Sequence, residues 1–440
     1  MKKSAFMRRG IAVAFASIAA TTSAFAQTPP KIDAGDTAWM IVATAFVLMM
    51  TIPGLALFYT GMVRKKNVLN TMAMSFVSVA LVTLLWAIGG YSLAFTGDGA
   101  WIGSLDRIFL RGIEMETISP LAKTIPESLF MLYQGTFAII TVALVSGAVV
   151  DRMRFSAYLM FSVLWFFITY VPQAHWVWGG GFLQQMGVID FAGGTVVHIN
   201  AGVAALVAAY VIGVRRGYGQ DNMAPYDLSM AVIGTGLLWV GWFGFNGGSA
   251  LGAGGRATMA IVVTHLAACT GAAVWMALEW YQRGKPSVLG MISGAIAGLG
   301  TITPASGFVL PWHGVVIGAL AGVICYYACT WLKHRLRYDD SLDVFGVHGV
   351  GGIIGTIFAG VFATAALSVT PEAAGTAGLI EGNPHQVWLQ LIGVAATIAW
   401  SAVTTLIILK IVALIVPLRV SDEEERAGLD LRQHGEQIHT

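Results

Sequence analysis

Three histidines and one lysine lie inside long apolar stretches of this chain: His198, His265, His348 and Lys410. An ionisable side chain at mid-membrane depth is costly, so each is a candidate for contacting a polar guest or moving a proton. Lys410 is near the end of its stretch, where a long side chain can reach the interface. His265 has no counterpart elsewhere in the sequence and is expected to pack.

His198 and His348 occur in similar surroundings. Each follows an acidic residue, Asp190 in the first segment and Asp343 in the second, and each is followed by small residues. The match suggests an internal repeat, although the intervals from aspartate to histidine differ. Two buried histidines that only form hydrogen bonds within the core remain an alternative.

Aromatic and weakly polar residues gather near the ends of three apolar stretches, in 133–137, 175–181 and 242–249. An interfacial aromatic belt would explain many tryptophans of a membrane protein. These aromatics, however, stand beside glycine runs, Asn246 and Ser249, a poor composition for a surface that faces lipid. Aromatic faces with one hydroxyl acceptor suit a small cation that donates hydrogen bonds.

The composition decides what kind of chain positions these residues. Of 440 residues, 56% are hydrophobic and 11% are charged, mean hydropathy is +0.73 and net charge is +2. A soluble domain carries about 25% charged residues. The weak net charge excludes nucleic-acid-binding and disordered classes, and the long apolar stretches predict an all-α membrane protein.

Eleven transmembrane helices are expected, which places the two ends of the chain on opposite sides of the membrane. Their approximate ranges are 38–60, 68–95, 127–150, 155–172, 195–214, 227–248, 257–280, 287–304, 313–332, 344–367 and 385–416.

Charge asymmetry orients the bundle, because cytoplasmic loops carry an excess of Lys and Arg. Thirteen of these residues fall in connections on one side: Arg64, Lys65, Lys66, Arg152, Arg154, Arg215, Arg216, Arg283, Lys285, Lys333, Arg335, Arg337 and Arg419. Five fall on the other side: Lys31, Arg107, Arg111, Lys123 and Arg256. We therefore expect a periplasmic N-terminus and a cytoplasmic C-terminus.

The chain is expected to have three parts. Residues 1–26 have a basic start, an apolar run and a small-residue site ending at Ala26, which indicates a signal peptide. Residues 27–417 form the transmembrane domain and 418–440 a polar cytoplasmic tail. Spans one to five and six to ten are expected to form an inverted repeat, followed by a last long helix, with the substrate path at the repeat interface.

The chain resembles the ammonium transporter (Amt/Mep/Rh) family, close to its bacterial branch. The resemblance is carried by 46–59, 190–200, 241–246 and 343–349, in one register from about Asp36 to the tail. It implies a homotrimer of the inner membrane with one pore in each subunit.

The resemblance also implies roles for individual residues. Ser249, Trp178 and Phe137 correspond to an outer ammonium-binding site. Phe137 and Phe245 correspond to gating phenylalanines, with Tyr133 standing where a phenylalanine is common. His198 and His348 correspond to a histidine pair that lines the pore, and Asp190 to an aspartate that supports the outer vestibule or caps a helix.

These parts predict a physical route for ammonium. Moving a bare cation into a low dielectric costs on the order of 20 kcal/mol in the idealised limit. Removing a proton from ammonium, whose pKa is roughly two units above neutral, costs about 3 kcal/mol. Deprotonation is therefore the cheaper route through an apolar constriction, and potassium has no proton to lose.

Partners and alternatives follow from the same residues. The retained patterns at 428–431 and 434–436 imply control by a cytoplasmic PII-type signalling protein. An ammonium sensor with little flux is one alternative, and a haem protein with His198 and His348 as axial ligands is another. No nucleophile–base motif or metal triad occurs in the spans, so neither an enzyme nor a cofactor or metal is predicted.

Overall fold

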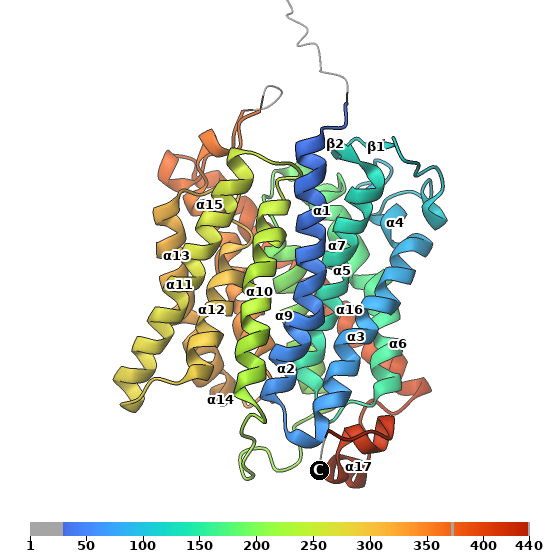
Figure 1. The fold of residues 1–440 in the computed structure, drawn as a ribbon, viewed down its shortest axis with the longest axis vertical. Coiled ribbons are helices and arrows are strands. Elements are labelled where there is room, and N and C mark those ends of the chain that lie inside the picture. Colours follow the sequence, from blue (N-terminus) through green and yellow to red (C-terminus); the bar gives the residue numbers. More distant parts are fainter. Residues whose placement is uncertain (1–29, 371–373, 439–440) are drawn as a thin grey trace, which may run out of the picture. The chain divides into compact units, whose positions relative to one another are not determined.

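The computed structural model describes residues 30–370 and 374–438, and residues 31–440 form one compact unit. The expected signal peptide, 1–26, lies outside the described residues. Throughout, the α1 end is the end of the bundle where the first helix begins, and the tail end is the opposite one (Figure 1).

The first half of the bundle contains five membrane-spanning segments. They are α1 (Ala34–Met49) with η1 (Met50–Leu55) and α2 (Ala56–Met62); α3 (Val68–Leu85) with η3 (Trp86–Gly90) and α4 (Tyr91–Phe95); α5 (Glu127–Val149); α6 (Phe155–Trp165) with η5 (Phe166–Tyr170) and α7 (Val171–Trp178); and η6 (Gly194–Ile199) with α9 (Asn200–Ile212).

The second half repeats this number of segments, and one further helix follows it. They are α10 (Leu228–Gly248); α11 (Gly255–Arg283); α12 (Val288–Ile302); α13 (Pro311–Tyr327) with η7 (Ala328–Leu332) and α14 (Lys333–Leu336); η8 (Phe345–Gly349) with α15 (Val350–Phe362); and α16 (Pro384–Ile415). Ten of the eleven are long and apolar enough to cross a membrane by themselves, and α12 is a shorter apolar helix. The expected eleven-helix architecture is confirmed.

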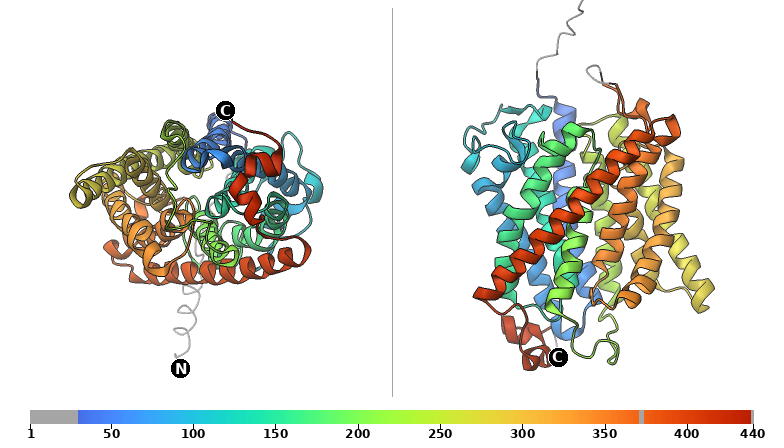
Figure 2. Two further views of the ribbon diagram at one scale, coloured as in Figure 1. Left: turned by 90° about the horizontal axis from the view of Figure 1, so that it is seen from below. Right: turned by 180° about the vertical axis from the view of Figure 1, so that it is seen from behind.

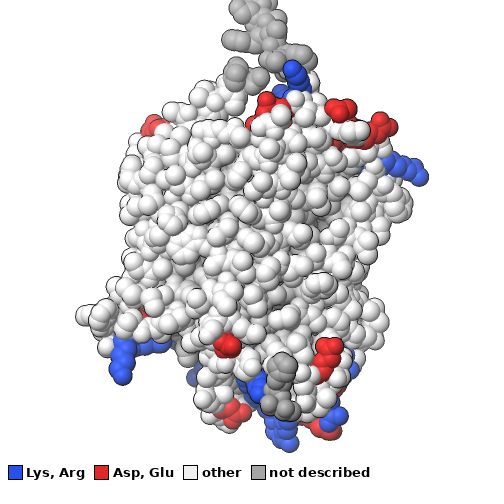
Figure 3. Space-filling view, in the orientation of Figure 1, with Lys and Arg blue, Asp and Glu red and all other residues white. Residues whose placement is uncertain are grey.

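Charged side chains are confined to the two ends of the face shown in Figure 3, with a broad band free of them between. Helices suit this band because each satisfies its own backbone hydrogen bonds where water is absent. The chain is therefore a multi-pass membrane protein.

Glycine lets the two histidine-bearing segments, η6–α9 and η8–α15, approach closely at the centre. A Cβ on Gly202 would lie 2.3 Å from the Gly349 Cα atom, and one on Gly352 would lie 2.9 Å from the Gly194 carbonyl oxygen. Each segment thus packs its small residues against the backbone of the other. This close contact sets the two histidines at one depth.

Helix α16 ties the two halves together. It crosses the bundle obliquely (Figure 2, right) and, with 32 residues, is longer than a membrane requires. Its Thr397 accepts a hydrogen bond from Gln173 of the first half at 2.8 Å, and its Gln390 donates to the Thr356 carbonyl of the second half at 3.0 Å.

The connection from Thr96 to Pro126 forms a folded cap at the α1 end. It contains η4 (Ile108–Leu110) and an antiparallel pair, β1 (Ile118–Ser119) and β2 (Ala122–Pro126). Arg107 holds the buried Glu127 carboxylate with two hydrogen bonds of 3.0 and 3.1 Å. The short helix α8 (Phe182–Met186) lies at the same end.

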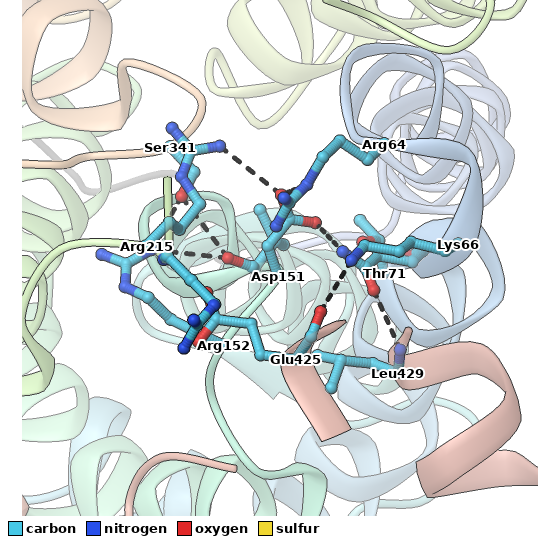
Figure 4. Close-up of polar contacts among 12 residues, drawn as sticks. Arg64, Lys66, Thr71, Asp151, Arg152, Arg215, Ser341, Glu425 and Leu429 are labelled. Atoms are coloured by element: carbon cyan, nitrogen blue, oxygen red, sulfur yellow. Dashed lines mark hydrogen bonds and ion pairs between the residues drawn. The ribbon is translucent and has the colours of Figure 1, made fainter. Parts of the chain in front are cut away.

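The tail folds back onto the tail end of the bundle through α17 (Asp422–Ala427) and η11 (Asp430–His434). Lys66, in η2 (Lys65–Asn67), donates to the Glu425 and Arg426 carbonyl oxygens at 2.7 and 2.8 Å (Figure 4). The Asp430 carboxylate accepts from the Asn70 amide at 2.8 Å. The remaining elements, η9 (Ala365–Leu367) and η10 (Leu379–Glu381), lie in the connection before α16.

Candidate functional site

A cavity at the α1 end brings the predicted aromatic and hydroxyl residues together. It is lined by Leu121, Phe130, Gln134, Phe137, Trp178, Gln184, Phe191, Ser249 and Leu251. The Phe137 and Trp178 rings meet edge to face, with centroids 5.7 Å apart. Trp178 is fixed because its indole N–H donates to the Asp190 carbonyl at 2.9 Å. No lining residue carries a charge.

Ser249 is oriented as a hydrogen-bond acceptor. Its hydroxyl donates to the Phe245 carbonyl at 2.8 Å, which uses its one proton. Because a hydroxyl keeps two acceptor lone pairs, the Ser249 oxygen can accept from a guest with N–H groups. The site therefore combines π faces with an acceptor, which matches a small hydrogen-bonding cation.

Two stacked phenylalanines close the floor of this cavity. The Phe137 and Phe245 rings lie with centroids 4.2 Å apart and an interplanar angle of 29°. Both are buried, so they form an apolar barrier between the α1-end cavity and the interior. Phe245 borders the next cavity on its other side.

Tyr133 packs behind this barrier. Its ring centroid is 5.0 Å from that of Phe137. Its hydroxyl contacts the Gly244 and Phe245 carbonyl oxygens at 3.0 and 2.9 Å and the Ser249 hydroxyl at 3.3 Å. Tyr133 therefore anchors the end of α10, and it is not among the residues that line the cavity.

The middle cavity contains His198 and His348, the two histidines that the resemblance assigns to a pore. It is lined by Met50, Leu55, Phe58, Ile140, Leu144, Val197, His198, Leu238, Trp242, Phe245, Ile296 and His348. The two Nδ1 atoms of His198 and His348 lie 3.2 Å apart, and the imidazole planes differ by 13°. Trp242 stacks on His198 at 5.6 Å and donates to Thr303.

The contact between the two Nδ1 atoms restricts the protonation of the pair. A hydrogen bond between them needs one protonated and one unprotonated Nδ1. When both rings are neutral, one Nε2 is then an acceptor and the other a donor. His198 Nε2 is buried with no hydrogen-bond partner among the described residues. The pair therefore offers both kinds of contact to a small polar guest, while nitrogens so close leave no room for a haem between them.

Asp190 positions His198 by capping η6. Its carboxylate accepts from the Gly193, Gly194 and Thr195 amides at 2.7, 2.7 and 2.8 Å and from the Thr195 hydroxyl. A carboxylate suits the positive end of a helix. These donors saturate the charge of Asp190, which agrees with the capping role more than with a free charge in the vestibule.

The corresponding residue in the second half is Asp340, which the sequence comparison missed. Asp340 accepts from the Phe345 amide at 2.7 Å and so caps η8. It precedes His348 by eight residues, the interval from Asp190 to His198. Asp343, the residue matched by sequence, pairs instead with Lys333 at 2.7 Å. Equal spacing to each histidine was the signal that could have found Asp340.

A third cavity opens from the histidines toward the tail end. It is lined by Phe58, Tyr59, Met62, Met223, Pro225, Trp275, Leu289, Ser293, Ile296, Cys329, Ser341, Leu342, Asp343, Val347 and His348. It shares Phe58, Ile296 and His348 with the middle cavity. The three cavities therefore succeed one another along the bundle, with the phenylalanine pair and His348 at the two divisions.

The other two ionisable candidates lie away from this line of cavities. His265 is exposed on α11, between the rings of Trp239 and Phe243 and 3.6 Å from the Cys269 sulfur. Lys410 is exposed on α16. Neither lines any of the three cavities.

A helical bundle with a row of cavities, an apolar barrier and buried imidazoles defines a membrane transport protein for a small polar guest. Comparison with known proteins names the family. Residues 38–439 match the model of the Ammonium Transporter Family, and the chain belongs to that family.

Relatives and solved structures agree with this assignment. The chain is 50% identical over 405 residues to a putative ammonium transporter of Methanothermobacter thermautotrophicus, covering 92% of this chain and 98% of that protein. It is 47% identical to an ammonium transporter of Bacillus subtilis, with the same coverage. Among solved structures, Saccharomyces cerevisiae Mep2 superposes with a TM-score of 0.82 at 38% identity, covering 89% and 88% of the two chains. A sensor Amt protein superposes with a TM-score of 0.82 at 28% identity, covering 91% and 98%.

Proposed function

We propose that this chain moves ammonium across the bacterial inner membrane by deprotonating it and conducting ammonia past the histidine pair. The observation that carries the proposal is the succession of three cavities, interrupted by the stacked Phe137 and Phe245 rings and followed by His198 and His348. The α1 end is then periplasmic, and the tail end is cytoplasmic.

Binding begins at the α1-end cavity. Ser249 accepts a hydrogen bond from ammonium while the Phe137 and Trp178 rings offer π faces to its charge. An N–H bond then breaks: its electron pair stays on nitrogen, and the proton passes to water in the α1-end cavity and crosses separately by way of the ring nitrogens of His198 and His348. The neutral molecule crosses an apolar barrier far more cheaply than the ion does.

Beyond the barrier, the histidines take the place of water. Ammonia both donates and accepts hydrogen bonds, and the coupled tautomers of His198 and His348 provide one Nε2 of each kind. The rest of the middle cavity is apolar except for the indole of Trp242. Selectivity follows, because a potassium ion would enter this cavity with its full charge and no replacement for its hydration shell.

The proposal is tested with purified protein in liposomes on a solid-supported membrane, using matched pulses of ammonium and potassium. We expect charge displacement with ammonium alone, and its loss in the double variant His198→Ala/His348→Ala. His265→Ala is the matched control, since it removes a histidine from a span without touching the cavities. Undiminished current in the double variant excludes the pair from the mechanism.

A sensor is the second candidate, because a sensor Amt protein shares this fold. Uptake of labelled methylammonium into the same liposomes separates the two functions. A transporter accumulates the label in proportion to time and protein, whereas a sensor binds it without accumulation. Loss of uptake in Ser249→Ala would place binding at the α1-end cavity.

The assembly and the partner are also proposals. Exposed large apolar residues on α11, α13 and η7, including Val262, Trp312, Val315 and Trp331, suit contact with lipid or with further copies in a homotrimer. The folded tail presents exposed acidic residues of α17, which a PII-type protein would contact at the cytoplasmic end. Light scattering in detergent measures the number of copies, and co-purification with and without residues 418–440 tests the partner.

A further inference from the structure

Arg256 lies directly behind the wall of the α1-end cavity. It is the second residue of α11, and its guanidinium carbon is 4.9 Å from the Phe191 ring centroid and 4.8 Å from that of Phe308. Its Nε donates to the Gly307 carbonyl at 3.0 Å. Two aromatic faces and one carbonyl therefore hold this cation in place.

The charge of Arg256 is not neutralised by a nearby acid. None of the ion pairs found among the described residues involves it. Asp190, next to Phe191 in sequence, gives its carboxylate to the amides of η6. A guanidinium stays protonated at any physiological pH. A fixed positive charge therefore acts on the cavity, none of whose lining residues is charged.

The Phe191 ring lies between Arg256 and the cavity, and it is held in place in the cavity wall. Its ring lines the cavity together with Phe137, Trp178 and Ser249. The ring also rests on Gly307, where a Cβ would lie 2.1 Å from it. Because Arg256 already contacts this ring, Phe191 is a poorer second site for a cation than the Phe137 and Trp178 rings.

We propose that Arg256 is a specificity-determining residue, whose charge weakens the residence of cations in the cavity and favours a guest that can shed its charge. The inference rests on the proposed function. Repulsion acts on ammonium and potassium alike while both are charged. Ammonium escapes it on becoming ammonia, whereas potassium does not.

The test compares wild-type protein with Arg256→Gln and Arg256→Lys in phosphatidylcholine liposomes on a solid-supported membrane. In Arg256→Gln we expect the half-saturating ammonium concentration to fall about three- to tenfold, the size expected of one partly screened unit charge. Because the repulsion acts on both cations, the inhibition constant of potassium should fall by a similar factor in this variant. Arg256→Lys keeps the charge without the planar stacking and should remain close to wild type.

Two controls separate this charge from its alternatives. Arg111→Gln removes an exposed charge from the same end without contacting Phe191, and it should leave the half-saturating concentration unchanged. Raising ionic strength with the bulky cation N-methylglucamine should lower the half-saturating concentration of wild type and leave that of Arg256→Gln constant, because screening removes a repulsion that the variant lacks.

Three results would overturn the inference: equal half-saturation in Arg256→Gln and wild type, equal potassium competition, or an Arg256→Lys protein that behaves like Arg256→Gln. The last result would assign Arg256 to holding Phe191 rather than to its charge. Thermal unfolding in increasing ammonium chloride measures binding in parallel. A wild-type protein that binds without conducting contradicts the proposed function, while the charge effect is still read from the binding curves.

Discussion

The middle cavity and the tail end of the bundle both bury polar side chains, but the hydrogen-bonding capacity of these side chains is used in opposite ways. In the middle cavity, His198 and His348 share one contact, and His198 Nε2 has no hydrogen-bond partner among the described residues. At the tail end, an ionic cluster gives its buried charges several partners each. We define this ionic cluster as Asp151, Arg152, Arg215 and Asp339. The neighbouring Arg64 is half-buried and contacts Asp151, but its Nη2 has no hydrogen-bond partner among the described residues.

Asp151 and Arg152 illustrate the saturation of the cluster (Figure 4). One Asp151 oxygen accepts from Asn67, and the other contacts Arg64 at 3.1 Å and Arg215 at 3.5 Å. Every guanidinium nitrogen of Arg152 donates a hydrogen bond: Nε to the Gly213 carbonyl, Nη1 to the Ser341 hydroxyl and Nη2 to the Asp339 carbonyl. Both residues are fully buried.

The difference separates structural polar groups from functional ones. A saturated cluster fixes the loops between spans and has no bonding capacity left for a guest. An undersatisfied pair costs stability, and it persists where a guest supplies the missing contact. Removing a member should therefore cost stability in the cluster and conduction in the pore.

The largest expected effect is on stability, in Asp151→Ala. The change leaves the buried Arg215 and the half-buried Arg64 with one carboxylate fewer, and breaking a buried pair costs about 3–5 kcal/mol. We expect a large fall in the midpoint of thermal unfolding in detergent. Asp422→Ala, which removes an exposed partner of Arg216, should cost at most about 1 kcal/mol. Equal unfolding midpoints for the two variants would show that the buried cluster contributes no more to stability than an exposed ion pair.

An intermediate effect is expected from pH, through Asp340. Burial raises the pKa of this carboxyl to about 6, with Lys333 opposing the shift and Asp343 adding to it. The folded protein then binds the proton more tightly than the unfolded chain does. This stabilisation is complete below pH about 4 and is lost as pH rises through about 6, a change on the order of 3 kcal/mol.

Asp340→Asn measures that contribution, because the amide keeps an oxygen for the Phe345 N–H and cannot ionise. We expect the difference in thermal unfolding midpoint, wild type minus variant, to decrease as pH rises from 4 to 7. Asp422→Asn provides the exposed control. Parallel pH profiles for wild type and Asp340→Asn would show that Asp340 titrates alike in both states.

The smallest effect is expected for Tyr133→Phe. Loss of the hydroxyl removes the contacts to the Gly244 and Phe245 carbonyls, worth about 1 kcal/mol. The ring that packs on Phe137 stays, and only the hydroxyl contact that helps to orient Ser249 is lost. We therefore expect the ammonium current to remain within about twofold of wild type. A current abolished by this change would move Tyr133 into the gate itself.

Much of the fold follows from the sequence, because helix in a membrane is dictated by local composition. Each of the eleven expected ranges overlaps a helical segment, including the short α12. The tail was harder to foresee. Its polar composition fits a solvated terminus, yet Glu425 is buried. It contacts Arg419, six residues earlier in the tail, and Arg216, which only the folded chain brings near.

The site was predictable to the extent that residue type and family motif define it. The sequence singled out Ser249, Trp178, Phe137, Phe245 and the two histidines, and the structure places them along one line of cavities. The sequence pattern matched Asp343 to Asp190, because Asp343 begins the motif around His348. In the structure Asp340 caps η8, and Asp343 pairs with Lys333. The position of Arg256 behind Phe191 had no sequence signal at all.

Composition alone determined that this chain is a bundle of membrane-spanning helices. Long apolar segments exclude water, so their backbone N–H and C=O groups must form hydrogen bonds within the segment. The family motifs indicated which side chains form the site. The contact of His198 with His348 and the placement of Arg256 against Phe191 and Phe308 needed the tertiary structure. Each joins segments far apart in the chain, and the distance between such segments is set by packing, through the close approach of Gly202 to Gly349, rather than by local sequence.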